Sequence, residues 1–476
     1  MFQFIGREEE LKGLRTLLNK KSASLVVIKG RRRIGKSRLA EEFGKNFDHT
    51  YSFAGLAPTV ETTNEHQKKE FLRQMHLQKI STPIKEDGDW GDIFTDLARK
   101  CYRGRVLIII DEISWIGAYD PTFLGKLKTT WDQYFKKNSK LVLILSGSQS
   151  TWIEQNIINN TGFLGRISYQ LTLQELALSE CNQFWKHQKL ISPYEKFKLL
   201  SVTGGIPRYL EEIQPQLSAE ENVRRLCFKP EGLLFNEFEQ IFSDLFSKRS
   251  NKYKLITQHL VEGPSTADNI ASMLERSKGG DLSLYLEDLC TTGFVTRDYT
   301  WDIKAGRPSK LSQYRLSDNY VRFYLKWVEP NRNKILSGVS GYLSPAWLTS
   351  LGFQFENLVM SKKNRPRLYE KLGIPPGEIV WANPFFQTKT QNRQGCQIDF
   401  MILTKFNILY LCEIKFRAKE IDKDIIQEIQ QKIDRLSLPR NFSIRPILIH
   451  VNGFHESLIE SEFFSHIIDF ADFLEE

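Results

Sequence analysis

One eight-residue segment constrains the fold of this chain more than any other, and it reads Gly30-Arg31-Arg32-Arg33-Ile34-Gly35-Lys36-Ser37. It follows a short apolar run, Leu25–Ile28, which predicts a buried strand, and it leads into residues 37–43, which predict a helix. A loop that closes onto a helix N-terminus offers an anion several backbone N–H groups and the positive end of the helix dipole. The segment therefore predicts a phosphate-binding loop in an α/β domain.

Each residue type in the loop suits a nucleoside triphosphate. Gly30 and Gly35 allow unusual backbone angles and a close approach of the ligand. Lys36 can reach the β- and γ-phosphates, and the hydroxyl of Ser37 can ligate Mg²⁺. We assign the whole segment, with Arg38 after it, to nucleotide binding.

A second apolar run ends in two carboxylates. Residues 106–110 read as a fully buried parallel strand, and Asp111 and Glu112 follow it directly. Strand-end acids lie where open α/β sheets bind ligands. We expect Asp111 to hold the Mg²⁺ shell and Glu112 to polarise the water that attacks the γ-phosphate.

Two later positions are weaker candidates. A third apolar run, residues 141–145, ends in polar residues that include Ser148 and Gln149; these could contact the γ-phosphate or its attacking water, or form a plain turn. Arg166 follows a glycine-containing loop. Its side chain is either a solvated charge or a group that stabilises transition-state charge, in its own subunit or across a subunit interface.

The bulk properties set the class of protein. A chain of 476 residues with 41% hydrophobic content predicts two to four globular domains. No apolar run reaches the length of a membrane span, no signal-peptide pattern is present, and six scattered cysteines lack C-x-x-C pairs, so we expect a cytoplasmic protein with reduced thiols. The net charge of +9 favours anionic partners, but it is too small to establish nucleic acid as one of them.

The order of motifs resembles that of archaeal-type ATPases, a branch of the AAA+/STAND signalling ATPases. The motifs are Phe4-Ile5-Gly6-Arg7-Glu8, the phosphate loop, Ile110-Asp111-Glu112, Leu145-Ser146-Gly147-Ser148, Gly165-Arg166 and Thr203-Gly204-Gly205-Ile206-Pro207. The resemblance covers roughly residues 1–330 and implies an ATPase core over 1–175 with a helical lid over 176–245. It also implies that Gly6 and Arg7 lie near the adenine, that Arg166 is an arginine finger, and that Pro207 belongs to a nucleotide-sensing turn.

Residues 246–330 predict a winged helix-turn-helix. Helical periodicity, a capped helix start at 265–271 and another amphipathic stretch at 282–289 precede two short runs, 293–297 and 314–316, that read as a β-wing. No strongly basic recognition helix stands out. The module therefore either reads DNA or serves as a packing piece between domains.

Residues 345–476 contain candidates for a second site, which differs in chemistry from the nucleotide site. Residues 397–403 and 408–415 predict a β-hairpin that brings Asp399 together with Glu413 and Lys415. Two carboxylates and a lysine suit a hard divalent metal beside a scissile phosphate, and Glu356, at the border of an upstream helical stripe, could join them as a further ligand.

This arrangement resembles the PD-(D/E)XK nuclease fold, with a predicted helix over 424–436 after the lysine and with Ile398 where the motif has proline. A charged hairpin without catalysis is the alternative.

Together these patterns predict an α/β chain in which a P-loop AAA+ ATPase domain with a helical lid controls a metal-dependent nuclease. The expected cofactors are ATP and Mg²⁺, with Mn²⁺ also acceptable at the nuclease site. The expected partners are nucleic acid, with DNA favoured, a second copy of the chain in the ATP state, and a protein as one candidate trigger. The competing hypothesis is a nucleotide-switched regulator or scaffold that binds DNA or protein without cutting it.

Overall fold

The structure is a computed structural model of the chain. It describes residues 4–80, 88–148, 150–185, 190–246, 250–274, 280–338, 346–389, 391, 394–436 and 438–475. Gln149 lies outside the described residues. The chain divides into two compact units, Met1–Gln174 and Glu175–Glu476, so the predicted division into four domains stays a prediction.

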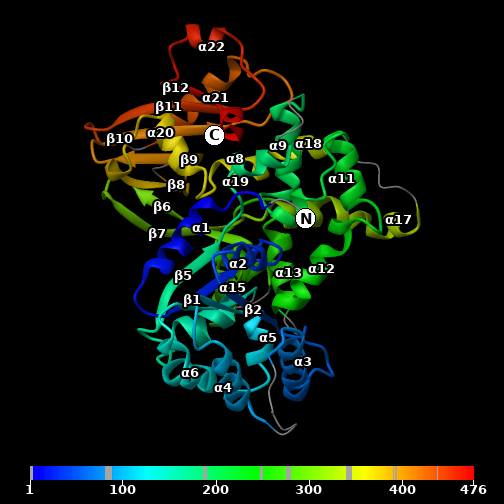
Figure 1. The fold of residues 1–476 in the computed structure, drawn as a ribbon. Coiled ribbons are helices and arrows are strands. Elements are labelled where there is room, and N and C mark those ends of the chain that lie inside the picture. Colours follow the sequence, from blue (N-terminus) through cyan, green and yellow to red (C-terminus); the bar gives the residue numbers. More distant parts are fainter. Residues whose placement is uncertain are drawn as a thin grey trace. The chain divides into compact units, whose positions relative to one another are not determined.

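The first unit is built on a parallel five-stranded sheet in the order β2-β3-β4-β1-β5 (Figure 1). Its strands are β1 (Ser24–Gly30), β2 (His49–Ala54), β3 (Val106–Asp111), β4 (Leu141–Gly147) and β5 (Ile167–Leu173). The central strands are mostly apolar and are buried along almost their whole length, because helices cover a parallel sheet on both faces. The predicted strands at 25–28, 106–110 and 141–145 are confirmed.

The helices of this unit include a capped helix, α4, whose Asp89 and Asp92 form a reciprocal capping box. Trp90 and Phe94 of α4 pack with Phe71 and Phe123 against strand residues such as Val27. Successive strand side chains alternate between faces, so Val26 and Ile28 face the other side of the sheet. The helices are α1 (Glu8–Arg15), α2 (Lys36–Gly44), α3 (Asn64–Leu77), α4 (Trp90–Lys100), α5 (Ile113–Gly117), α6 (Phe123–Gln133) and α7 (Ser150–Ile153).

The second unit begins with a helical region. Its helices are α8 (Leu178–Asn182), α9 (Pro193–Thr203), α10 (Pro207–Leu210), α11 (Ala219–Cys227), α12 (Leu233–Phe246), α13 (Ser250–His259), α14 (Ala267–Met273) and α15 (Gly280–Thr291). Several begin at sequence-encoded caps: Ser192, Ser218 and Thr266 each accept a backbone N–H at a helix start. Helix α9 is buried along most of its length, as a helix enclosed by neighbouring elements must be.

An antiparallel ribbon, β6 (Val295–Asp302) with β7 (Arg307–Leu316), follows α15. Three helices and a ribbon are therefore present in the predicted order, and their assignment as a winged helix stays a prediction. The ribbon packs against the C-terminal sheet, since Trp301 and Ile303 belong to the same apolar core as Trp381 and Met401. Figure 1 shows β6 beside β8.

The C-terminal sheet has the order β12-β11-β10-β9-β8. The pairs β8–β9 and β9–β10 are antiparallel, whereas β10–β11 and β11–β12 are parallel, with α21 in the crossover between β10 and β11. The predicted hairpin, its turn at 405–407 and the helix from Asp424 are confirmed. The strands are β8 (Ile379–Gln387), β9 (Cys396–Thr404), β10 (Ile408–Ile414), β11 (Ser443–His450) and β12 (His466–Asp469).

The remaining helices connect the ribbon with this sheet or flank it. They are α16 (Asn319–Phe323), α17 (Arg332–Leu336), α18 (Ala346–Ser350), α19 (Gly352–Val359), α20 (Arg365–Lys371), α21 (Asp424–Asp434) and α22 (Ser457–Glu460), with a C-terminal 3₁₀ helix, Phe470–Leu474. The predicted helical stripe around residues 347–359 is divided at Leu351 into α18 and α19.

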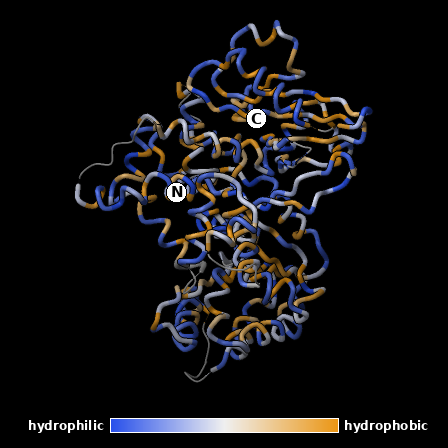
Figure 2. The backbone as a smooth tube through the Cα atoms, turned by 180° about the vertical axis from the view of Figure 1, so that it is seen from behind, coloured by the Kyte–Doolittle hydropathy of each residue, from blue (hydrophilic) through white to orange (hydrophobic). Residues whose placement is uncertain are grey.

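Hydrophobic residues line the inner segments of each unit, and hydrophilic residues occupy many of its outer turns (Figure 2). All six cysteines are free thiols, as expected, and burial raises the pKa of Cys101 to about 12. Among the residues that the structure describes, no helix is both long and apolar enough to cross a bilayer.

Candidate functional site

The phosphate loop connects the end of β1 with the start of α2, as predicted. Gly30 has φ 151°, and a Cβ atom at this position would lie 2.8 Å from the carbonyl oxygen of Leu173. Gly35, at the N-cap of α2, has φ 94°. Both positions therefore require glycine, which fixes the loop close to the sheet and leaves the helix N-terminus open to an anion.

Lys36 lies inside the loop rather than on the surface. Its side chain is buried, and Nζ donates to the carbonyl oxygens of Gly30 and Arg31, both at 3.1 Å. Burial lowers the pKa of Lys36, and the charges of Glu112 and Asp111 partly oppose that shift. A buried ammonium whose partners are carbonyl oxygens fits a phosphate well, because an anionic oxygen is a stronger acceptor than a peptide carbonyl.

Side-chain oxygens of three residues gather at the end of β3. Ser37 Oγ donates to Asp111 Oδ2 at 2.5 Å, and Ser146 Oγ donates to Asp111 Oδ1 at 2.7 Å. The pairing of β3 with β4 brings Asp111 and Ser146 together, since parallel strands end at one edge of the sheet. Hydroxyl and carboxylate oxygens suit Mg²⁺, so the donor set fits the ion expected from the sequence. The polar strand end at 146–148 was a sequence candidate, but only the fold shows that Ser146 contacts Asp111.

Glu112 occupies the left-handed backbone region, with φ 47°. Its Oε2 accepts hydrogen bonds from the backbone N–H of Ser148 at 3.0 Å and from Ser148 Oγ at 2.9 Å. Such a conformation is costly for a residue other than glycine, and functional sites retain it where the surroundings hold it. Ser148 thus orients the predicted general base, while direct contact of Ser148 with the attacking water stays a prediction.

Arg7 contacts the phosphate loop from the segment that precedes α1. It has φ 64°, it is 2% exposed, and its guanidinium donates to the carbonyl oxygen of Ile34 at 2.9 Å and to Glu10 Oε1 at 3.2 Å. Gly6 before it has φ 69°. Their predicted proximity to the adenine stays a prediction.

Arg166 forms an ion pair with Asp132 of α6, with Nη2 2.8 Å from Oδ2. Lys128 and Lys136 also approach this carboxylate, and the guanidinium and the two ammonium groups hold the pKa of Asp132 well below its ordinary value. In this structure Arg166 is therefore a paired charge, and its role as an arginine finger stays a prediction.

Pro207 begins α10 in the second unit, after a tight turn. Gly204 has φ 59°, and a Cβ on Gly205 would lie 2.6 Å from the carbonyl oxygen of Leu176. Glycine is thus required for the turn, while nucleotide sensing by Pro207 stays a prediction.

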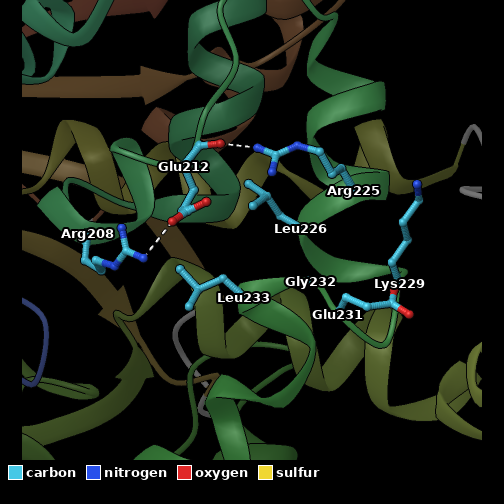
Figure 3. Close-up of a pocket in the computed structure, with 8 residues that line it drawn as sticks. All are labelled: Arg208, Glu212, Arg225, Leu226, Lys229, Glu231, Gly232 and Leu233. Carbon is cyan, nitrogen blue, oxygen red and sulfur yellow. Dashed lines mark hydrogen bonds and ion pairs between the residues drawn. The ribbon is translucent and has the colours of Figure 1, made fainter.

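A pocket of about 420 Å³ lies after this turn, among α10, α11 and the start of α12. Figure 3 shows Leu226 and Leu233 pointing toward its centre, with Lys229 at one side. Arg208 pairs with Glu211 and Glu212, and Arg225 donates to the backbone carbonyl of Glu212. The two glutamates largely neutralise Arg208, and none of the pocket's lining residues was a sequence candidate.

The C-terminal candidates converge near the start of β9 and the end of β10. Asp399 Oδ2 accepts a hydrogen bond from the backbone N–H of Ile414 at 2.9 Å. Glu413 is 1% exposed, and its carboxylate contacts Lys415 Nζ at 2.8 Å. The predicted convergence of Asp399, Glu413 and Lys415 is therefore observed.

Burial and neighbouring charge raise the pKa of two acids of this cluster. Burial, then the charge of Glu413, raises the pKa of Asp399 to about 7. Burial, then the charge of Asp399, raises the pKa of Glu356 on α19 to about 8, with Arg315 and Arg322 opposing the shift. Interacting acids in a partly desolvated site are typical of functional sites.

Two residues of α21 complete the cluster and were not sequence candidates for the metal site. Lys432 Nζ donates to both oxygens of Glu413, at 2.8 and 2.7 Å, and Glu428 accepts from Lys415 at 2.8 Å. The sequence does offer one signal for them: Glu428 and Lys432 are four residues apart on the helix that follows Lys415, so their side chains lie on the same face of that helix. Within the described ranges, no three His, Cys, Asp or Glu side chains are grouped so that they could hold a metal ion, so metal ligation by Glu356, Asp399 and Glu413 stays a prediction.

Comparison with known proteins agrees with the first half of the chain. Residues 4–213 match a family described as an ATPase domain predominantly from Archaea. An uncharacterized protein of Methanocaldococcus jannaschii is 28% identical over 387 residues, which are 78% of this chain and 81% of that protein.

Solved structures extend the comparison to the fold. The Walker-type ATPase of Pyrococcus abyssi superposes with a TM-score of 0.50 at 19% identity, over 68% of this chain and 96% of that chain. The ORC2 protein of Aeropyrum pernix, solved with ADPNP and ADP, reaches a TM-score of 0.42 at 15% identity, over 71% of this chain and 96% of that one.

The chain thus carries an archaeal-type ATPase domain on a parallel P-loop sheet, together with a separate C-terminal sheet.

Proposed function

We propose that this protein is an ATP-dependent switch whose nucleotide state controls a metal-dependent nuclease that acts on DNA. The proposal rests on one observation: the chain contains two separate clusters of side chains that suit catalysis. One is a phosphate loop with a buried lysine beside Asp111 and Glu112. The other is a cluster of acids and lysines at the ends of two strands in the C-terminal sheet.

In the first site, the loop and the α2 N-terminus bind the phosphates, and Lys36 neutralises them. Ser37 and Asp111 would hold Mg²⁺, which when bound offsets the charge that develops on the phosphates. Glu112, held by Ser148, accepts a proton from the attacking water. Arg166 would leave Asp132 to reach a neighbouring copy's site if the ATP state assembles into an oligomer.

In the second site, Asp399, Glu413 and Glu356 would hold Mg²⁺ or Mn²⁺, which when bound polarises the scissile phosphate. Lys415 stabilises negative charge on that phosphate. The parallel β10–α21–β11 crossover after an antiparallel hairpin supports the likeness to PD-(D/E)XK nucleases. DNA is the proposed substrate, and a defence or stress response is the proposed setting, by analogy with the family that the sequence resembles.

Aromatic contacts offer a route from the lid to the cluster. Tyr194 and Phe197 of α9 contact Phe416 and Phe355 respectively, with centroids 5.0 and 5.6 Å apart. Phe416 follows Lys415 and Phe355 precedes Glu356. A shift of α9 would therefore move both edges of the cluster.

The alternative function is a nucleotide-switched regulator or scaffold that does not cut. It is favoured by one observation: Lys415 and Lys432 both pair with Glu413, so the most buried acid of the cluster is already neutralised. A cluster of this kind is also stable as a purely structural ion-pair network.

A cleavage assay separates the two functions. Purified protein is incubated with plasmid, linear and single-stranded DNA, with and without ATP, in Mg²⁺ or Mn²⁺. We expect cutting that requires metal and responds to ATP, loss of the ATP response in Lys36→Ala, and loss of cutting in Asp399→Ala and Lys415→Ala with ATP hydrolysis retained.

Glu420→Ala is the matched control, because Glu420 is a nearby exposed acid outside the cluster. It should cut as the wild type does. If the Asp399 or Lys415 variant cuts at the full rate, the cluster in the C-terminal sheet is not the site of cleavage. If the wild type does not cut under any condition, the regulator or scaffold function replaces the nuclease.

A further inference from the structure

We infer that the outer face and tip of the β6–β7 ribbon form a surface that holds the phosphate backbone of a nucleic acid. The surface, called here the ribbon face, consists of Arg297, Tyr299, Lys304, Arg307 and Lys310. The inference rests on the proposed nuclease function and adds to it the place where the substrate is held.

The two faces of the ribbon differ in chemistry. On the inner face, Asp298 forms a buried ion pair with Arg315 at 2.8 Å, and Thr300 Oγ1 accepts the backbone N–H of Phe386 in β8 at 3.1 Å. Trp301 is 8% exposed and lies with its centroid 6.1 Å from that of Trp381. The inner face therefore packs against the C-terminal sheet and is not available to a ligand.

On the outer face, Arg297 lies over two rings, 4.8 Å from the centroid of Tyr299 and 5.3 Å from that of Tyr314. Its Nε donates to Ser312 Oγ at 2.9 Å. The tyrosine rings and the serine restrain the guanidinium, so it loses little side-chain freedom when it meets a ligand. Tyr299 is 41% exposed.

The charge of this surface is strongly one-sided. Arg297, Lys304, Arg307 and Lys310 are exposed cations within the 14 residues 297–310. The interval also holds two acids: Asp298 is buried in its ion pair with Arg315, and Asp302 is exposed. Lys304, Arg307 and Lys310 form no ion pair with any residue that the structure describes. A row of unneutralised cations beside an exposed aromatic ring matches the requirements of a polyanionic backbone, because each phosphate contact releases counterions.

The helix that would read bases in a winged helix is not suited to the task. Helix α15 carries Asp281, Glu287 and Asp288 and no lysine or arginine. An acidic helix is repelled by the phosphates that border a DNA groove. The ribbon face is thus predicted to hold the backbone without reading sequence, and an acidic protein, the other polyanion it could meet, is a result that the experiment can reveal.

The test measures fluorescence anisotropy of a fluorescein-labelled 30-base-pair DNA, and of the matching single strand, with the full-length protein in EDTA without ATP. A triple variant, Lys304→Glu, Arg307→Glu and Lys310→Glu, should bind at least about tenfold more weakly. The slope of log affinity against log salt concentration should fall by about 2 to 3, since each lost phosphate contact removes about 0.7 to 0.9.

The control variant carries the same charge change on three exposed lysines of the first unit: Lys69→Glu, Lys100→Glu and Lys140→Glu. It should keep most of the affinity and the full slope. Substitution of the three ribbon residues by glutamine, with unchanged melting temperature, should reproduce the loss if the glutamate variant folds poorly.

Equal losses in the two triple variants would overturn the inference, as would wild-type affinity in the ribbon variants. DNA binding that is absent in the wild type, with heparin or an acidic peptide bound at the ribbon instead, would also overturn it. Because EDTA prevents cleavage, DNA binding without later cutting in Mg²⁺ would contradict the proposed nuclease and leave the ribbon face standing.

Discussion

The ring of Tyr194 stacks on the ring of Phe416, with centroids 5.0 Å apart and planes inclined by 26°. Tyr194 belongs to α9, within the matched ATPase region, and Phe416 directly follows Lys415. Phe416 in turn stacks on Phe355, again at 5.0 Å. The ATPase match and the acid cluster are therefore joined by direct packing inside the second unit.

Tyr194→Ala should separate nucleotide hydrolysis from the response of the acid cluster. Loss of the stack removes about 0.5–1.5 kcal/mol of ring interaction, which weakens the coupling without removing either site. We expect near wild-type ATP hydrolysis and a cleavage rate that no longer changes with ATP. Tyr134→Ala, at an exposed tyrosine of the first unit, is the control; an ATP response kept in full by Tyr194→Ala would contradict this route.

Lys36→Ala should abolish productive ATP binding, because it removes the buried cation from inside the loop. ATP at about a hundred times its dissociation constant stabilises a binding protein by about 2.7 kcal/mol. A thermal melt with ATP and Mg²⁺ should show this shift in the wild type and not in the variant. The nucleotide assignment fails if both proteins shift equally.

Glu112→Gln should keep ATP affinity and slow hydrolysis by about 10²–10⁴-fold, since the amide cannot accept the proton of the attacking water. Ser148→Ala should slow it less, by about tenfold, because one hydrogen bond that orients Glu112 is lost while the backbone one remains. Steady-state phosphate release measures both, with the exposed Ser139→Ala as the control. A Ser148 variant as slow as Glu112→Gln would mean that Ser148 acts on the water itself.

Lys432→Ala should lower the free energy of unfolding of the metal-free protein by about 1–3 kcal/mol, because Glu413 loses one of its two lysine partners. It should also increase the stabilisation by Mn²⁺, since the ammonium no longer competes with the ion. Differential scanning calorimetry with and without Mn²⁺ tests both effects, with Lys423→Ala at the exposed start of α21 as the control. The absence of a Mn²⁺ effect in both wild type and variant would favour a structural cluster.

His450→Phe should reduce the loss in the free energy of unfolding that occurs when the pH falls from 7 to 5. Burial lowers the pKa of His450, and the charges of Asp469 and Asp472 only partly oppose the shift. At pH values between the pKa of His450 in the folded state and its pKa in the unfolded state, near 6.5, the unfolded chain holds more protons. The contribution of His450 to the free energy of unfolding is therefore present above about pH 6.5 and is lost as the pH falls through the folded pKa. Urea unfolding at pH 7 and pH 5 should show a smaller decrease in the variant; parallel decreases would show that His450 does not titrate.

The sequence determined the local parts of this protein. The strand runs, the phosphate loop, the hairpin around 405–407 and the helix from Asp424 follow from apolar periodicity, glycine positions and turn residues, all of which act over a few neighbouring residues. The candidate acids Asp111, Glu112, Asp399 and Glu413 could be located because they stand at the ends of such runs.

Only the tertiary structure decided which distant side chains meet. Ser146 contacts Asp111 because β3 and β4 pair in register, and Lys432 reaches Glu413 because α21 packs back onto the β9–β10 hairpin. The pairing of Arg166 with Asp132 and the stacking of Tyr194 on Phe416 have the same origin. Strand order, crossover packing and the burial of charge depend on the whole chain at once, so no local pattern in the sequence encodes them.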